Sequence, residues 1–358
     1  MENLKRRLML PGFALVAGAA LTACGGDEEA GGDNGGDGPE YEWDFITEET
    51  PGQVQYEYAQ EYADLLNEKS DGRIEVDVFE FGGLGSEVDQ LEQLQAGGVE
   101  LGIVSPGFVS TLVEEAQIFS LHYLLPDDQE QTQEILNESE AVNEMLAEKY
   151  VEQGLQPLSF WTEGAMQWTG SSQLRSSEDF EGFLMRTQES PLMIESYGAY
   201  GADATPLSWE ELYGGLQQGQ VDGQENPIFF IEDASFHEVQ DHMTISNHNS
   251  YVAVTTMNQN IYEELPEDIQ EIVHETTEEM RDIGFDLQDE LNEERLEMIE
   301  EDEENPTEVY ELTDEEIEEF QDLARPVRDF FREEEGEEAA EILDQLEEDI
   351  AEVTGEEE

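Results

Sequence analysis

Strand-like and helix-like stretches alternate along the chain from about residue 43, and this alternation restricts the possible folds. Trp43–Thr47 is a short apolar stretch, and residues 54–66 repeat apolar side chains at helical spacing. Residues 74–78 then alternate apolar with acidic side chains, the pattern of a strand with one wet face. Ser86 can cap a second helix, and Leu101–Ser105 is another buried strand. This order predicts an open α/β sheet, in which ligands bind at the carboxyl ends of the strands.

The balance of charged residues indicates where the protein works and not what it binds. The chain of 358 residues has 92 Asp and Glu against 13 Lys and Arg, a net charge of −79. Self-repulsion on this scale opposes a compact state in dilute buffer, but at about 1 M salt the Debye length is roughly 3 Å. The composition therefore predicts a protein from a halophile. It also argues against nucleic acid and against an anionic membrane surface as partners.

Residues 1–24 are predicted to be a lipoprotein signal peptide. Residues 5–7 are basic, residues 8–20 form an apolar stretch too short to span a bilayer, and Leu-Thr-Ala-Cys ends at Cys24. Cys24 is the only cysteine, so no internal disulfide is possible, and an ordinary buried thiol is the alternative to lipidation. Residues 25–40, rich in Gly and acids, predict a flexible tether. We expect an exported protein, periplasmic or extracellular, whose only membrane attachment is a lipid anchor on the outer face of the cytoplasmic membrane.

One arginine is isolated in the acidic background. Arg186 is the only Lys or Arg between Arg175 and Arg281, and it follows the apolar run Phe183–Met185, which predicts a buried strand. A guanidinium binds a carboxylate through two parallel hydrogen bonds and stays charged at any working pH. Asn226, in a predicted DGQENP turn, can donate to the same kind of ligand group. A structural salt bridge with a neighbouring Asp or Glu is the alternative for Arg186.

Three stretches carry a resemblance to a known family. They are GFLMRTQES (182–190), PLSWEELYGGLQQGQVDGQENP (206–227) and ISNH (245–248). These stretches resemble the solute-binding proteins of tripartite ATP-independent periplasmic (TRAP) transporters, the DctP family, and the resemblance covers nearly the whole chain beyond the tether. It implies that Arg186 binds the carboxylate of the solute and that Asn226 assists it.

The resemblance also implies the fold class: two α/β lobes, each with an open sheet flanked by helices, and a ligand cleft between them. Lobe I is expected to comprise residues 41–163 and about 252–291, and lobe II residues 164–251 and about 292–358. A long helical pattern that begins at Pro266 resembles the helix that runs under both lobes of the family. Within lobe I, residues 132–151 predict one amphipathic helix.

Position 166 departs from the family pattern. Many members have a second arginine there, whereas this chain has Met166. A dicarboxylate requires two cationic anchors, so we expect a solute whose second half is apolar, aromatic or cationic, beside Met166, Trp168 and Trp209. Each tryptophan has core packing as an equal alternative. A small monocarboxylate, an oxo or hydroxy acid, and a zwitterionic compatible solute all fit this pattern, and a C4-dicarboxylate is less favoured.

The loops after the first three predicted strands are further candidate walls of the cleft. Glu48 and Glu49 follow the first strand, Phe81 lies beside a glycine-rich turn after the second, and Phe108 follows the third. In the family these loops line the cleft, so the resemblance implies that Glu49, Phe81 and Phe108 contact the solute. A tight turn that needs positive φ angles explains the glycines equally well.

The predicted function is an extracytoplasmic receptor that delivers a small organic acid or zwitterionic solute to a sodium-coupled TRAP permease. We expect a monomer that is not an enzyme and that holds no cofactor and no metal. The histidines show no metal spacing, and a structural role is the stronger interpretation of His248. The alternatives are a ligand-binding protein of an ABC-type uptake or sensory system and a carboxylate-dependent hydrolase, since 92 acids guarantee carboxylate pairs in space.

Overall fold

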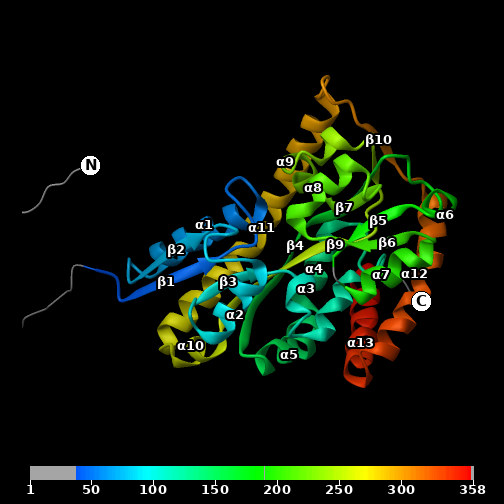
Figure 1. Cartoon of the computed structure of the whole chain (residues 1–358). Coiled ribbons are helices and arrows are strands. Elements are labelled where there is room, and N and C mark those ends of the chain that lie inside the picture. Colours follow the sequence, from blue (N-terminus) through cyan, green and yellow to red (C-terminus); the bar gives the residue numbers. More distant parts are fainter. Residues whose placement is uncertain (1–37, 189, 356–358) are drawn as a thin grey trace, which may run out of the picture. The chain divides into compact units, whose positions relative to one another are not determined.

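The computed structural model describes residues 38–188 and 190–355 (Figure 1). The predicted signal peptide (1–24) with its lipidation site Cys24, and most of the predicted tether (25–40), lie outside the described residues. In the described part of the chain, no helix is both long enough and apolar enough to cross a membrane.

The described strands form a ten-stranded sheet in the order β2-β1-β3-β9-β4-β7-β5-β6, which β8 and β10 join beside β4. Parallel pairing joins β1 to β2 and β3, and β5 to β6 and β7, whereas β9 is antiparallel to β3 and β4. The strands are β1 (Tyr41–Ile46), β2 (Ile74–Phe79), β3 (Leu101–Val104), β4 (Leu155–Gly170), β5 (Leu184–Thr187), β6 (Asp203–Pro206), β7 (Gly223–Pro227), β8 (His242–Ile245), β9 (Ser250–Asn258) and β10 (Glu308–Glu311).

Helices cover both faces of the first part of this sheet. Phe45 and Ile46, neighbours on β1, point to opposite faces and belong to different hydrophobic clusters. One cluster packs under α1 and α11, the other under α2, α4 and α13. The described α-helices are α1 (Val54–Lys69), α2 (Glu87–Ala96), α3 (Pro106–Val109), α4 (Gln129–Glu138), α5 (Ala147–Glu152), α6 (Ser177–Phe180), α7 (Pro191–Tyr200), α8 (Trp209–Gln218), α9 (Ile228–Asp233), α10 (Gln259–Glu264), α11 (Glu267–Glu301), α12 (Asp314–Glu334) and α13 (Glu337–Thr354).

The strand β4 joins the two parts of the sheet. Its first part pairs with β9, from Leu155 to Ala165, and its last part, from Met166 on, pairs with β7 and β8. This change of partner falls close to the predicted lobe boundary between residues 163 and 164. The helix α13, assigned to lobe II from the sequence, packs against α4 of the first part. The exact bounds of the lobes stay a prediction.

The longest described helix, α11, confirms the long helix predicted after Pro266. It has 35 residues, and Pro266 is its N-cap. At 1.5 Å per residue it is about 50 Å long. It packs against α1, β4 and α9, so it contacts elements on both sides of the change of partner in β4 (Figure 1).

The single helix predicted over residues 132–151 is wrong. The structure has α4, then a π-helical turn at Ala141–Leu146, then α5, with an extended backbone at Ser139. A carboxylate from α13 accounts for the break, because Asp349 Oδ2 accepts hydrogen bonds from Ser139 Oγ at 2.5 Å and from the backbone N of Ala141 at 3.1 Å. A partner 210 residues away leaves no local sign in the sequence.

A glycine lies where β4 changes partner. Gly164 has φ +112°, and its pairing with β9 is irregular between Thr162 and Ala165. A Cβ at this position would lie 2.5 Å from Nδ2 of Asn292 on α11. That same Nδ2 donates to the carbonyl O of Glu163 at 2.9 Å, so the contact cannot move freely. Gly164 therefore permits a close approach of β4 to α11.

We predict that Gly164→Ala lowers the free energy of unfolding by about 2–4 kcal/mol, from backbone strain and overpacking together. Denaturant unfolding in high salt measures the change. Gly182→Ala is the matched control, because Gly182 also has a positive φ of +74° but has no atom within 4 Å of the added Cβ. Equal losses in the two variants would contradict a role for the contact with Asn292.

Candidate functional site

Arg186 lies on β5 with a buried side chain, 5% exposed. Its Nε donates to the carbonyl O of Leu207 at 3.0 Å, which orients the guanidinium. Every other Lys and Arg in the described residues has an Asp or Glu oxygen within 4.0 Å, whereas Arg186 has none. The structural salt bridge considered from the sequence is therefore not formed.

Burial alters the charge equilibrium of Arg186 without removing its charge. Burial lowers the pKa of Arg186 to about 10, and the nearby charge of Glu225 acts in the opposite direction. The guanidinium is thus protonated at neutral pH, buried and without an ion-pair partner among the described residues. A buried, unpaired charge destabilises the folded protein, and an anion that binds to Arg186 would remove this destabilisation.

Asn226 lies on a buried strand and not in the predicted turn. The strand β7 runs between β5 and β4, and Asn226 is opposite Gln167 in the antiparallel register with β4. The polar side chains of β7 can be buried because they form hydrogen bonds with one another and with β4. Asn226 Nδ2 donates to Gln224 Oε1, and Gln224 Nε2 donates to Thr169 Oγ1 at 3.0 Å. Arg186 and Asn226 therefore come from neighbouring strands.

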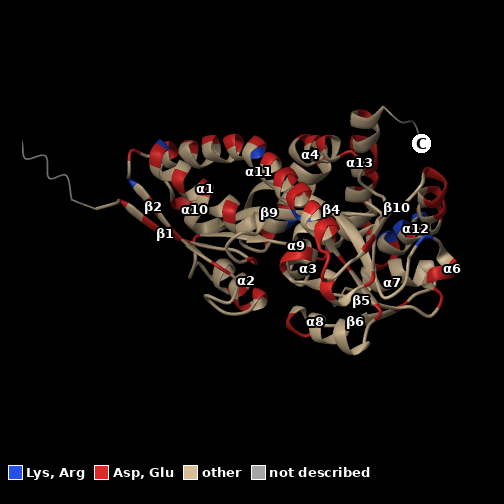
Figure 2. Cartoon of the chain, turned by 90° about the horizontal axis from the view of Figure 1, so that it is seen from above, with Lys and Arg blue, Asp and Glu red and all other residues tan. Residues whose placement is uncertain are grey.

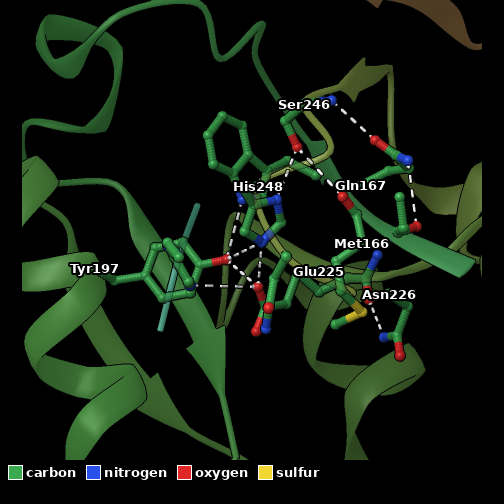
Figure 3. Close-up of polar contacts among 12 residues, drawn as sticks. Met166, Gln167, Tyr197, Glu225, Asn226, Ser246 and His248 are labelled. Carbon is green, nitrogen blue, oxygen red and sulfur yellow. Dashed lines mark hydrogen bonds and ion pairs between the residues drawn. The ribbon is translucent and has the colours of Figure 1, made fainter. Parts of the chain in front are cut away.

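A buried network surrounds Glu225, the residue before Asn226 (Figure 3). His248 Nε2 and the Tyr197 hydroxyl each lie 2.5 Å from Glu225 Oε2, and His122 Nε2 lies 3.9 Å away. Burial alone would raise the pKa of Glu225, but the hydrogen bond and charge of His248, with His122 and Tyr197, lower it to about 2. Glu225 is therefore ionised and supplies a negative charge near Arg186.

The three residues His122, Glu225 and His248 are the one described group whose ligand-type atoms are close enough to suggest a metal ion, all within 4.8 Å. Two ligands of a tetrahedral zinc ion lie about 3.3 Å apart. The 2.5 Å between His248 Nε2 and Glu225 Oε2 is shorter than that separation, so these two atoms form a hydrogen bond. The geometry fits a hydrogen-bonded network that supports β7, and His248 Nδ1 completes it at 2.8 Å from Ser246 Oγ.

Trp168, a predicted solute contact, lies in the interior behind this network. It is 0% exposed, its Nε1 donates to the Tyr197 hydroxyl at 3.0 Å, and its ring stacks on His248 with centroids 4.6 Å apart. The structure therefore places Trp168 in contact with the residues that hold Glu225, and among the aromatic side chains of the core.

Met166 lines a small cavity of about 40 Å³. Its other lining residues include the Ser105–Gly107 turn after β3, Gln188, Glu225 and Tyr251. The position at which many family members have a second arginine thus carries an apolar side chain, which offers a solute no second cationic anchor.

Three carboxyl groups gather near the end of β1. Glu48 and Glu49 follow β1, and Glu163 lies on β4. Gln55, at the start of α1, forms a hydrogen bond with each of these three residues. The backbone N of Gln55 donates to Glu49 Oε2 at 2.6 Å, its Nε2 donates to Glu163 Oε1 at 2.8 Å, and its Oε1 accepts from the backbone N of Glu48 at 3.0 Å. Each carboxyl keeps one buried oxygen without a hydrogen-bond partner: Glu48 Oε2, Glu49 Oε1 and Glu163 Oε2.

The pKa of each of these carboxyl groups is raised. Burial raises the pKa of Glu48 to about 8, against the effect of its hydrogen bonds with Ser105. Burial, and then the charge of Glu163, raise the pKa of Glu49 well above its usual range, and burial raises that of Glu163. Buried carboxyl oxygens without donors favour either a proton or a bound cation.

Tyr251 on β9 lies within electrostatic range of both Arg186 and the three carboxyl groups. Burial raises the pKa of Tyr251 well above its usual range, and the charges of Glu48 and Glu163 raise it further. The same tyrosine contributes to the pKa of Arg186. Tyr251 therefore lies between the electrostatic surroundings of an unpaired cation and those of carboxyl oxygens without donors.

Aromatic rings extend from Tyr251 towards α8. The ring centroids of Tyr251 and Phe230 are 6.0 Å apart, and those of Phe230 and Trp209 are 5.3 Å apart. Trp209 is half-buried, as a ring that faces a ligand would be. The structure thus connects the predicted contact Trp209 to the region between Arg186 and the carboxyl groups.

The two predicted phenylalanines lie on the same side as the carboxyl groups. The backbone N of Phe81 donates to the carbonyl O of Glu49 at 2.8 Å, and Phe108 lies on α3 just after Ser105, whose backbone N donates to Glu48 Oε1 at 3.2 Å. Both rings are half-buried. Their contact with a solute stays a prediction.

Sequence reasoning missed Glu163, Tyr251, Phe230 and Glu225. No single acid is conspicuous among 92, so Glu163 and Glu225 gave no signal. Tyr251 and Phe230 lie in apolar stretches, where core packing is the ordinary interpretation.

Comparison with known proteins identifies the family of the chain. A family model for the bacterial extracellular solute-binding protein, family 7 (DctP), matches residues 45–335. The ectoine-binding periplasmic protein TeaA of Halomonas elongata is 39% identical over 316 residues, 88% of this chain and 92% of TeaA. The ectoine/5-hydroxyectoine-binding periplasmic protein UehA of Ruegeria pomeroyi is 39% identical over 209 residues, 58% of this chain and 61% of UehA.

Solved structures show the same architecture. The ectoine-binding protein of the TeaABC TRAP transporter superimposes with a TM-score of 0.83 at 38% identity, over 87% of this chain and 99% of that one. A TRAP solute-binding protein from Desulfovibrio salexigens with bound orotic acid gives 0.80 at 26% identity, over 87% and 99%. The chain belongs to the DctP family of TRAP solute-binding proteins, whose relatives are named as binding proteins and not as enzymes. The two-lobed α/β fold predicted from the sequence is confirmed.

Proposed function

We propose that this protein is the receptor of a TRAP transporter for a zwitterionic compatible solute of the ectoine class. Arg186 pairs with the carboxylate of the solute, and Asn226 helps to orient it. Glu49, with Glu48 nearby, accepts hydrogen bonds from the cationic group, and Trp209 covers the ring. A single observation carries the proposal: Arg186 alone among the described cations has no acidic partner, while nearby carboxyl groups keep oxygens without donors.

A solute with a single carboxylate and no cation satisfies only half of this region. It would pair with Arg186 but would itself supply no donor to Glu48, Glu49 and Glu163. A dicarboxylate would add negative charge near these groups, and Met166 offers it no second anchor. The names of TeaA and UehA, which are those of ectoine-binding proteins, point to the same class of solute.

Calorimetric titration in about 2 M NaCl tests the proposal, because surface repulsion is screened there. Ectoine is expected to bind at least about 100-fold more tightly than succinate or lactate, a difference of about 2.7 kcal/mol. Tighter binding of succinate or lactate than of ectoine would overturn the proposed solute class. Thermal unfolding with each solute gives an independent readout, since a ligand that binds only the folded state raises Tm.

We further propose that the loaded receptor closes and docks onto a sodium-coupled TRAP permease, and that lipidated Cys24 tethers it to the outer face of the membrane. Closure would exclude water and strengthen the pairing between Arg186 and the carboxylate, because the local dielectric constant falls. Family membership supports the permease as partner.

A further inference from the structure

Glu163 has no part in binding the carboxylate of a solute in the proposed function, yet hydrogen bonds hold both its backbone and its side chain. Its side chain is 0% exposed, and its backbone O accepts a hydrogen bond at 2.9 Å from Asn292 of α11. Its Oε1 accepts a hydrogen bond from Gln55. An ionised carboxyl group buried this deeply destabilises the folded protein unless it pairs with a cation or takes up a proton.

Gln55 forms hydrogen bonds with both Glu163 and Glu49. It donates its backbone N–H to Glu49 Oε2 at 2.6 Å and its side-chain amide to Glu163 Oε1 at 2.8 Å. The second oxygens, Glu49 Oε1 and Glu163 Oε2, are both buried and find no donor in the described chain. Both carboxyl groups are thus bound to one residue, and the charge of Glu163 raises the pKa of Glu49. Two carboxylates so close in a buried site cannot both stay ionised, so one proton is shared between them.

We propose that Glu49 and Glu163 hold one proton between them in the ligand-free receptor, and that the cationic N–H group of the solute replaces this proton on binding. The inference rests on the proposed function, since it concerns the cationic half of the same solute. The solute stays protonated throughout, and the displaced proton leaves to the solvent. Glu163 is in this view a positioning residue that acts through Glu49.

The groups around the pair contain no fixed positive charge. Glu48, from the loop after β1, and Tyr251, from β9, are the titratable groups that face the pair. Burial raises the pKa of Glu48, and the charge of Glu48 raises the pKa of Glu49. Negative charge on the pair in turn raises the pKa of Tyr251. The helix α11 contributes the neutral Asn292. No described Lys or Arg lies within 4.0 Å of either carboxyl. The site therefore needs a cation from outside before it can release its proton.

This exchange selects among cations. An amidinium or a protonated amine has N–H donors that can take over the hydrogen bond of the shared proton. A quaternary ammonium, as in glycine betaine, has a charge but no N–H, so it cannot satisfy the carboxyl oxygens. The pair is thus expected to favour zwitterions with an N–H cation over zwitterions without one.

Proton release on binding is the direct test. Wild-type protein is titrated with ectoine in high salt, in two buffers of different ionisation enthalpy, between about pH 6 and pH 9. Up to about one proton is expected to leave per ectoine bound, and the affinity is expected to rise up to about tenfold per pH unit where the pair is protonated. This measurement needs no variant, so it decides the question even if a substitution prevents folding.

Glu163→Gln adds a second readout. The amide can donate a hydrogen bond to Glu49 and carries no charge, so the pKa of Glu49 falls, and both the proton release and the pH dependence of the affinity are expected to decrease. Glu75→Gln on the exposed face of β2 is the matched control and should keep both. Ectoine binding without proton release in the wild type would overturn the shared proton while leaving the proposed function standing. No ectoine binding at any pH would overturn the proposed function itself.

Discussion

Replacing Arg186 with alanine is expected to weaken binding of the solute by about 100-fold or more, within the 2–5 kcal/mol that loss of a buried charge pair costs. The carboxylate of the solute would then enter a buried site without a cation, next to the ionised Glu225. Calorimetry in high salt with ectoine measures the loss.

Two further variants separate the causes of this loss. Arg186→Lys keeps the charge but not the two parallel donors, so an intermediate affinity is expected. Arg325→Ala removes an exposed arginine that pairs only with Asp322 on its own helix, and it should bind like the wild type. Undiminished binding by Arg186→Ala would refute the role of the guanidinium. Its ligand-free form should be no less stable than the wild type, because it no longer buries an unpaired charge.

Transfer from about 2 M to about 0.1 M NaCl is expected to unfold the protein, since the Debye length grows from roughly 2–3 Å to about 10 Å. Figure 2 shows Asp and Glu along most helices, and Lys and Arg at few places, such as α12. The helix α11 alone has fifteen Asp and Glu against two Arg. Repulsion between these exposed carboxylates increases as screening falls.

Circular dichroism against salt concentration measures this transition. KCl at equal ionic strength should restore the fold, whereas sucrose at equal osmolality should restore less, because it does not screen charge. A fold unchanged at low salt would contradict the view that the acidic surface depends on screening. If the proposed function holds, ectoine should shift the midpoint to lower salt, because a ligand that binds only the folded state stabilises that state.

The predictable part of the fold is the part encoded by local pattern. The alternation at β1, α1 and β2, the cap at Ser86 and the long helix after Pro266 all appear where the periodicity and the capping residues placed them. Ser86 even forms a full capping box with Asp89. These elements follow from interactions within a few residues, which a single sequence displays.

The strand β7 could not be predicted from the sequence because residues distant in the sequence stabilise it. Its residues Gln224, Glu225 and Asn226 are polar, and polar residues near glycine and proline suggest a turn. Their burial is possible only because Thr169 and His248, distant in the sequence, supply hydrogen bonds. The break at Ser139 has the same origin in Asp349.

The candidate site was predicted unevenly for a similar reason. Arg186 could be found because a basic residue is rare in this chain. Glu163 could not, because its importance depends on burial beside Glu49 and on the bridging amide of Gln55. Rarity is a property of composition, whereas burial is a property of the folded chain.

The packing of α13 against α4 has a consequence for biogenesis. The helix α13, far from α4 in the sequence, completes a cluster that includes Leu136 and Val142, so this core lacks its cover until α13 has been synthesised. Contacts of such long sequence separation delay the formation of a stable native state. A nascent chain of this protein is therefore expected to stay loosely folded until α13 has been synthesised.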